Sequence, residues 1–111
     1  MNIEYIDKYI TEWYDEYGSI HRTGGPAKIW PNGCEDWLQH GELHRDGGPA
    51  VIRNHHYFEY WKYGKLHRED GPAIDHAGVG FFADRYYIEG KRMKKPEFDR
   101  YICKKRILKI K

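Results

Sequence analysis

Three histidine–arginine pairs recur at a fixed spacing and are the first candidates for chemistry in this chain. They are separated by 23 residues and comprise His21 and Arg22, His44 and Arg45, His67 and Arg68. A row of guanidinium groups beside glycine-rich loops suits the binding of phosphate or carboxylate. Three imidazoles suit zinc, but each nitrogen must come within about 2.0–2.1 Å of the ion and an adjacent arginine repels the cation. The remaining alternative is structural.

In the structural alternative each histidine holds a turn by hydrogen bonding. Each arginine then stacks on an aromatic ring or pairs with an acid such as Asp46, Glu69 or Asp70. Deciding between these roles requires the elements that carry the pairs.

The pairs belong to a longer motif, His-Arg-x-x-Gly-Pro-Ala, which occurs three times at the 23-residue period. Its Gly-Pro dipeptides are Gly25-Pro26, Gly48-Pro49 and Gly71-Pro72. A glycine precedes each histidine by three residues, and an aromatic residue (Tyr14, Trp37 or Tyr60) precedes that glycine by four. A fourth copy contains Tyr86 and Gly90, but Met93 and Lys94 replace its histidine and arginine. The chain is therefore a repeat whose last unit has degenerated, as expected where no further neighbour follows.

Each unit predicts a β-hairpin, because short aromatic-rich segments alternate with turn sequences. The first hairpin has strands at 28–30 and 34–39 around the turn 31–33. The second has strands at 49–53 and 57–61 around the turn 54–56. The third runs from 72 to 76, turns at 77–78 and returns through 81–82 and 86–87. In the Gly-Pro pair, glycine can supply a positive φ, and proline starts a strand where no N–H is required.

The two ends of the chain predict helical caps. Ile3, Ile6 and Ile10 have helical spacing, which predicts a helix over residues 2–11. Pro96 followed by acidic residues is typical of a helix start, and the side chains that share a face of this second helix are Phe98, Tyr101 and Ile102. Such segments can cover the exposed ends of a stack of hairpins.

The predicted fold is therefore mainly β, a single-domain array of antiparallel β-hairpins with short helical caps at both ends. Residues 1–12 form the N-terminal cap. Residues 13–93 hold three full hairpin repeats and the degenerate fourth. Residues 94–111 form a basic C-terminal helix or tail.

Charge is divided unevenly along the 111 residues, whose formal net charge is +2. Residues 91–111 carry ten Lys and Arg against two acids, a net of +8, which leaves residues 1–90 with −6. The basic tail can dock on the acidic body, or it can serve as an arm for nucleic acid or another polyanion. The residues that would contact the polyanion are Lys104, Lys105, Arg106, Lys109 and Lys111.

Composition narrows the class of protein. No apolar run approaches the roughly 20 residues that span a bilayer, and the first residues lack the pattern of a secretory signal. Two cysteines do not make a disulfide framework, so we expect a reduced, cytoplasmic protein. We expect Cys34 to be a packing residue, whereas the basic neighbours of Cys103 favour a thiolate. No catalytic, nucleotide-binding or metal motif is present, so we expect neither an enzyme nor a cofactor nor a bound metal.

The segment before the third motif resembles the MORN repeat, which carries W-x-x-G-K-x-H-G in a hairpin unit of about 23 residues. The matching residues are Trp61-Lys62-Tyr63-Gly64-Lys65-Leu66-His67. Arg68 stands where that family has glycine, and the H-R-x-x-G-P-A form resembles a MORN-like variant of tailed bacteriophages and large DNA viruses. The resemblance covers residues 13–93 and implies a module that binds or scaffolds proteins or membrane lipids.

Two functions follow as expectations. The first is a non-catalytic phage or viral protein that binds a host protein. Small phage proteins often inhibit host defence systems, so the partner can belong to such a system. Its candidate contacts are Arg22, Arg45, Arg68, Trp61, Tyr63, Tyr86 and Tyr87. The alternative is a binder of nucleotides, nucleic acid or another polyanion that uses the arginine row and the basic tail. Phosphate-driven binding falls steeply with salt, whereas an apolar protein interface falls much less.

Overall fold

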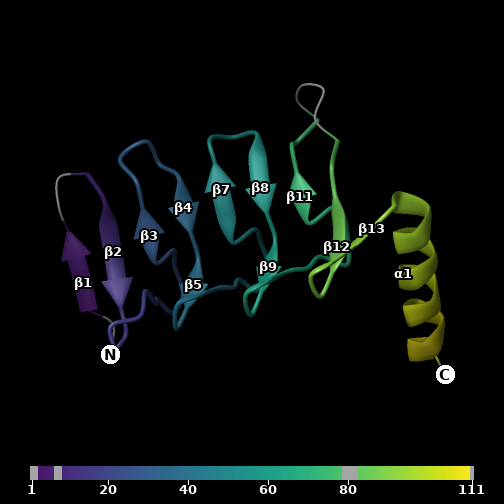
Figure 1. Cartoon of the computed structure of the whole chain (residues 1–111), viewed down its shortest axis with the longest axis horizontal. Coiled ribbons are helices and arrows are strands. Elements are labelled where there is room, and N and C mark those ends of the chain that lie inside the picture. The colour runs from purple at the N-terminus through teal and green to yellow at the C-terminus, as the bar shows by residue number, and fades with distance from the viewer. Residues whose placement is uncertain (1–2, 7–8, 79–82, 111) are drawn as a thin grey trace.

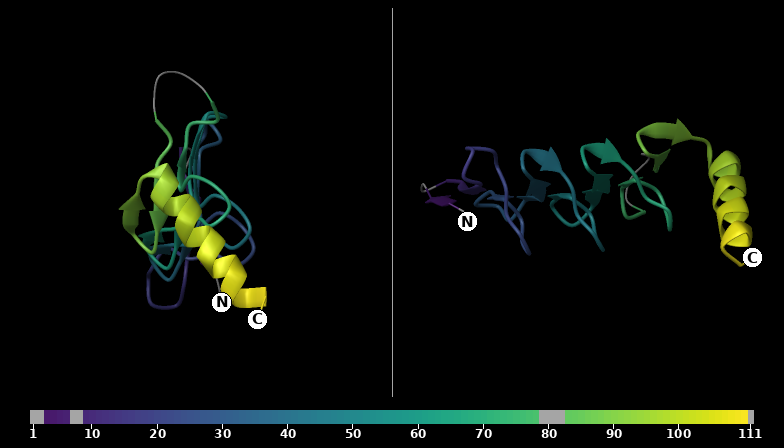
Figure 2. Two further views of the ribbon diagram at one scale, coloured as in Figure 1. Left: turned by 90° about the vertical axis from the view of Figure 1, so that its right-hand side faces the viewer. Right: turned by 90° about the horizontal axis from the view of Figure 1, so that it is seen from below.

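The chain forms a thin row of β-hairpins that ends in one helix (Figure 1). This computed structural model describes residues 3–6, 9–78 and 83–110. The row measures 47 × 36 × 19 Å along its principal axes. Seen from below, the hairpins stand side by side along the long axis, with the helix at the C-terminal end (Figure 2). The mainly β, hairpin-array prediction is confirmed.

The longer hairpins join into one antiparallel seven-stranded sheet, in the order β1-β2-β3-β4-β7-β8-β11. Their bounds are β1 Ile3–Ile6, β2 Thr11–Tyr14, β3 Lys28–Ile29, β4 Glu35–Asp36, β7 Val51–Arg53, β8 Tyr57–Glu59 and β11 Ile74–Asp75. Three short hairpins lie along the lower edge of this sheet (Figure 1). They comprise β5 Leu38–Gln39 with β6 Glu42–Leu43, β9 Trp61–Lys62 with β10 Lys65–Leu66, and β12 Tyr86–Ile88 with β13 Lys91–Met93. The helix α1 spans Lys95–Ile110.

The turns of the long hairpins fall where the sequence predicts them. Asn32 accepts a hydrogen bond from the backbone N–H of Cys34, as expected for an Asn-Gly turn between β3 and β4. Asn54, which follows β7, has a φ of 57°. In the third unit Ala77 and Gly78 both have positive φ, and Ile74 bridges to Arg85 on the returning segment. The predicted return through residues 81–82 lies outside the described residues.

The short hairpins turn on a residue–glycine pair in which both φ angles are positive, as in a type I′ turn. The pairs are His40-Gly41 with φ of 47° and 85°, Tyr63-Gly64 with 46° and 80°, and Glu89-Gly90 with 49° and 83°. These are the glycines that precede His44, His67 and Met93 by three residues. Their spacing in the sequence is therefore set by the geometry of a two-residue hairpin loop.

The predicted N-terminal helix over residues 2–11 is wrong in the described part of that segment. Ile3–Ile6 form β1, which pairs with β2 in the register Ile3 to Tyr14 and Ile6 to Thr11. Isoleucine and tyrosine favour strands, and a helix of about ten residues is marginal without tertiary packing. The edge of β2 offers unpaired backbone groups, so the segment adds a strand to the sheet instead.

The aromatic residue of the first unit is Trp13 rather than Tyr14. The backbone carbonyl of Trp13 accepts from the N–H of His21, as those of Trp37 and Tyr60 accept from the next two motif histidines. The first unit has seven residues between these two positions and the others have six, because its turn around Gly18 contains one more residue. Counting four residues back from the glycine therefore selects Tyr14, one residue after the true equivalent Trp13.

The helix α1 closes the C-terminal end and confirms the helix predicted there. Phe98 and Ile102 are buried against Ile88, with Tyr101 and Tyr86 packed around them. Complete burial of one such side chain contributes roughly 1.5–3 kcal/mol. The Nζ of Lys105 also lies 2.5 Å from a carboxylate oxygen of Glu69, so the basic helix docks on the acidic body.

Between the units the buried core is small. Ala27, Ala50 and Ala73, the last residues of the three motifs, have no exposed surface. The N–H of Ala27 donates to Asp36, and that of Ala50 donates to Glu59, in the returning strand of the same long hairpin. A small side chain at this position allows the two strands of the hairpin to approach closely.

We expect deletion of residues 37–59 to leave a folded, β-rich protein. The deletion joins Asp36 to Tyr60, which occupies the same position in its unit as Trp37. Because units contact only their neighbours, the shortened row should unfold cooperatively at a lower Tm, measured by circular dichroism during heating.

A deletion of residues 37–48 is the control, since it removes about half a unit and breaks the register. We expect this control to lose cooperative unfolding. A cooperative control, or a 23-residue deletion that does not fold, would contradict the modular description of the array.

Candidate functional site

Each motif arginine places its guanidinium over the aromatic ring of its own unit. The guanidinium carbon is 3.9 Å from the ring centre of Trp13 for Arg22, 3.6 Å from that of Trp37 for Arg45, and 3.9 Å from that of Tyr60 for Arg68. The Nη1 of each arginine donates to the carbonyl of the motif proline four residues later, at 3.3, 3.0 and 3.1 Å. The three arginines are half-buried. Stacking and hydrogen bonding together fix each guanidinium in one orientation.

The glycine before each proline is required because the guanidinium occupies the space of a side chain. A Cβ at Gly25, Gly48 or Gly71 would lie 2.8–2.9 Å from the Cζ of its own arginine. The sequence-based explanation, a positive φ at this glycine, is wrong: positive φ occurs one residue earlier, at Gly24 and Gly47. The Gly-Pro pair therefore forms one wall of the arginine site, opposite the aromatic ring.

Each motif histidine connects its unit to the next one. The Nδ1 of His21 accepts from the backbone N–H of His40 at 2.9 Å, that of His44 from Tyr63 at 3.0 Å, and that of His67 from Glu89 at 3.0 Å. The donors are the first residues of the turn pairs in the short hairpins. The next N–H of each turn donates to the residue before the histidine, as Gly64 does to Leu43 at 2.8 Å. Histidine does hold a turn, but the turn belongs to the following hairpin.

An acceptor Nδ1 requires the neutral tautomer with the proton on Nε2. In two units this Nε2 faces an acid, Asp46 at 3.4 Å from His44 and Glu69 at 3.2 Å from His67. Burial lowers the pKa of His21, and the neighbouring His40 acts in the same direction. No cluster of three or more His, Cys, Asp or Glu suitable for a metal is found among the residues that the structure describes. The three histidines therefore do not form the zinc site considered above.

Asp15 replaces the missing histidine at the start of the row. Its Oδ1 accepts from the backbone N–H groups of Tyr17 and Ser19, at 2.9 and 3.0 Å. Its Oδ2 lies 2.7 Å from the Nδ1 of His40 in the next unit. The hydrogen bond to His40 lowers the pKa of Asp15 most strongly, and the two backbone donors lower it further against the opposing effect of burial. A buried carboxylate thus stabilises the turn that no preceding unit can hold.

The turn around Gly18 and the turns of the three short hairpins present a row of exposed side chains, which we call the turn row: Tyr17, His40, Tyr63 and Glu89. Tyr17 is 83% exposed and Tyr63 is 70% exposed. The ring of His40 stacks on His21 at 3.9 Å, and that of Tyr63 lies 4.1 Å from His44. Sequence reasoning selected Tyr63 alone. The shared signal is the position immediately before each turn glycine.

The other predicted aromatic contacts are less accessible. Trp61 is half-buried, and its Nε1 donates to Glu59 at 2.8 Å. Tyr86 packs on Phe98 beneath α1, with ring centres 4.8 Å apart, and Tyr87 is half-buried. Of the four predicted aromatic residues, only Tyr63 is exposed.

The predicted cationic residues lie on or beyond α1. Lys104 and Arg106 are exposed, whereas Lys105 is half-buried against Glu69. Lys111 and the side chain of Lys109 lie outside the described residues. Of the cysteines, Cys34 is buried and Cys103 is exposed.

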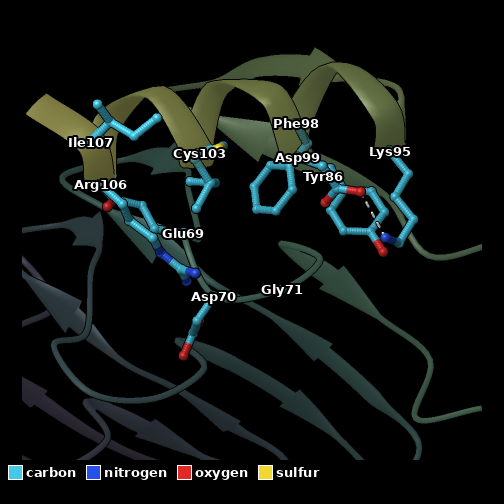
Figure 3. A pocket seen from close by; sticks show the side chains of 11 residues that line it. Glu69, Asp70, Gly71, Tyr86, Lys95, Phe98, Asp99, Cys103, Arg106 and Ile107 are labelled. Carbon is cyan, nitrogen blue, oxygen red and sulfur yellow. Dashed lines mark hydrogen bonds and ion pairs between the residues drawn. The ribbon is translucent and has the colours of Figure 1, made fainter.

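Open hollows follow one another between the units. One is lined by Trp37, His44, Arg45 and Tyr63, so a motif arginine and a turn-row tyrosine face the same space. The next is lined by Arg45, Tyr60, Arg68 and Asp70. In the last, α1 takes the place of a further unit and faces the turn that contains Glu69, Asp70 and Gly71 (Figure 3).

Comparisons with family models, with curated proteins and with solved structures find no match for this chain. In the part of the chain that the structure describes, no helix is both long and apolar enough to cross a bilayer.

We expect His44→Ala to destabilise the protein by roughly 1–3 kcal/mol, because the Tyr63 N–H loses its acceptor. His44→Asn should recover much of the loss, since the amide oxygen of asparagine can accept near the position of Nδ1. Urea denaturation of the three proteins measures the difference. Equal stability of the alanine and asparagine variants would show that this hydrogen bond contributes little.

We also expect Gly48→Ala to destabilise by roughly 1–3 kcal/mol, because its Cβ would lie 2.9 Å from the Arg45 guanidinium. In an Arg45→Ala background the same substitution should have almost no effect, since the clashing group is gone. Urea denaturation of the four members of this double-mutant cycle gives the coupling. An equal effect of Gly48→Ala in both backgrounds would contradict the steric explanation.

Proposed function

We propose that the protein is a non-catalytic binding protein that contacts another protein through the turn row and the hollows between its units. The resemblance to MORN-like repeats of bacteriophages and large DNA viruses supports a host protein as the partner. That precedent makes a component of a host defence system the first class of partner to test.

The observation that carries the proposal is the placement of exposed rings at successive turns. Tyr17 and Tyr63 each precede a turn glycine and are exposed, and the ring of Tyr63 packs on that of His44. A tyrosine with a fixed ring provides contact area with little loss of conformational freedom on binding. Tyr63 is also an unusual choice at a φ of 46°, where Asn, Asp and Gly are the common residues. Formation of the turn therefore does not explain the tyrosine, whereas a binding role does.

The engagement of the motif residues supports binding rather than catalysis. The Nδ1 of each motif histidine is occupied by a turn amide, and each arginine is held between a ring and a glycine. Proton transfer by these histidines would require breaking the contact between two units. The residue types best suited to acid–base chemistry are thus used to hold the array together.

The basic helix supports a second candidate, a binder of nucleic acid or another polyanion. Lys104 and Arg106 are exposed on α1, although Lys105 is paired with Glu69. Such binding would be electrostatic and would fall steeply with salt.

Affinity capture from a bacterial lysate tests both candidates. We expect the protein to retain a host protein after nuclease treatment and at about 0.5 M salt, where exposed charges are strongly screened. Tyr17→Ser combined with Tyr63→Ser should reduce capture about tenfold or more, the loss typical of aromatic residues at the centre of an interface.

The matched control is Tyr9→Ser, which removes an exposed tyrosine from the connection between β1 and β2. This variant should retain the partner. Capture that disappears with nuclease or salt would favour the polyanion alternative, and capture unaffected by the double substitution would exclude the turn row as the interface.

A further inference from the structure

The third motif arginine is neutralised by acids of its own unit. The Nε of Arg68 donates to Asp70 at 2.9 Å, and its Nη1 lies 3.3 Å from a carboxylate oxygen of Asp75. A carboxylate group therefore lies on the edge of this guanidinium that the stack with Tyr60 leaves open.

The first two units lack both acids. Gly24 and Gly47 stand at the position of Asp70 in the repeat, and isoleucines stand at the position of Asp75. Among the described residues, no carboxylate pairs with Arg22 or Arg45. The guanidinium of each makes one hydrogen bond, to the carbonyl of its motif proline. No side-chain nitrogen of these residues is both buried and without a partner, so the remaining N–H groups reach solvent. Two fixed guanidiniums thus present an open edge.

The backbone beside these two arginines also offers donors. Within the described part of the chain, the N–H groups of Gly24 and Gly25 have no acceptor, nor do those of Gly47 and Gly48. Successive backbone amides in a turn, one residue of which has positive φ, favour an anion.

We propose that Arg22 and Arg45 are two carboxylate-binding subsites, each of which takes one acidic side chain of an extended segment of the partner protein. The proposal rests on the proposed function, because it specifies the chemistry of the protein partner. The hydrogen bond from Arg68 to Asp70 is an example of this contact within the chain itself. In the first two units the corresponding position beside the guanidinium is open to a carboxylate from the partner. Arg45 shares its hollow with Tyr63, so an acidic side chain bound there lies beside the turn row.

Charge and spacing favour a peptide over a long polyanion. Residues 1–90 carry a net charge of −6, which repels a continuous row of phosphates but allows separate acids to reach fixed guanidiniums. Each unit contributes two strands to the sheet, so equivalent positions are about 10 Å apart. In a polyproline II segment, residues three apart lie on one side and are separated by about 9 Å. The matching partner sequence has acids at positions i and i+3.

The test uses a fluorescent, end-capped peptide, Pro-Asp-Pro-Pro-Asp-Pro, with the intact protein. We expect saturable binding by anisotropy, together with shifts of the Arg22 and Arg45 Nε–H signals, but not of Arg68, in NMR spectra. The peptide with Asn in place of both Asp should bind at least about tenfold more weakly, since charge-assisted hydrogen bonds are lost. Equal binding of the two peptides, or unchanged arginine signals, would overturn the proposal.

Gly47→Asp provides an internal carboxylate and should weaken peptide binding about tenfold. Gly47→Asn is its matched control, because it imposes the same strain at a φ of 82° without the charge, and it should bind within about twofold of the unchanged protein. Equal weakening by the two substitutions would contradict the proposal.

Asp70→Gly is the reciprocal variant and remains informative if neither substitution at Gly47 folds. It frees the Nε of Arg68, so this signal should also respond to the peptide, and a peptide with a third Asp at i+6 should bind about tenfold more tightly. An unresponsive Arg68 in this variant would overturn the proposal.

A ten-nucleotide single strand provides the remaining comparison. If this strand binds at Arg22 and Arg45 more tightly than the peptide does, the ligand of these subsites is a polyanion and the acidic-peptide proposal is wrong. If the peptide fails while capture of a host protein still depends on Tyr17 and Tyr63, the subsites are wrong and the proposed function stands.

Discussion

The hydrogen bond between a turn amide and the histidine of the preceding hairpin is the interaction on which the rest of this array depends. A two-residue turn with positive φ directs two N–H groups away from its own hairpin. In the second and third units, the first donates to His21 or His44 and the second to the carbonyl of Ile20 or Leu43. The turn and the preceding unit therefore order each other, which is why a single hairpin of this kind would lack part of its hydrogen bonding.

The ends of the row follow from the same requirement. The first turn has no preceding histidine, and the buried carboxylate of Asp15 accepts its amides instead. The last unit has no following hairpin, and Met93 stands at its histidine position, next to α1. The helix covers this end with Phe98 and Ile102 rather than with another turn. The row therefore ends at one side with a buried carboxylate in place of a histidine, and at the other with an apolar helix face in place of a further hairpin.

Much of this architecture could be predicted from the period, because strand and turn sequences repeat within each unit. The long hairpins, their turns at residues 31–33 and 54–56, and the C-terminal helix were accessible in this way. The period could not show which unit a side chain contacts. Only the structure shows that each histidine bonds to the following hairpin and that a side chain at position 48 would clash with Arg45. The segment around Ile3 was misassigned because its isoleucine spacing fits a helix as well as an added edge strand.

The motif also separates positions that the fold needs from positions that it leaves free. In His-Arg-x-x-Gly-Pro-Ala, the histidine holds the next turn, the arginine stacks, the glycine makes room for it, the proline carbonyl accepts from it, and the alanine allows close packing. The two intervening positions do not share one role, and they differ among the units: Thr23-Gly24, Asp46-Gly47 and Glu69-Asp70. The residue before each turn glycine also varies, as His40, Tyr63 and Glu89, although its backbone N–H makes the same hydrogen bond in each unit. The units therefore differ most at these positions, which carry the exposed Tyr63 and lie beside the open guanidinium edges of Arg22 and Arg45.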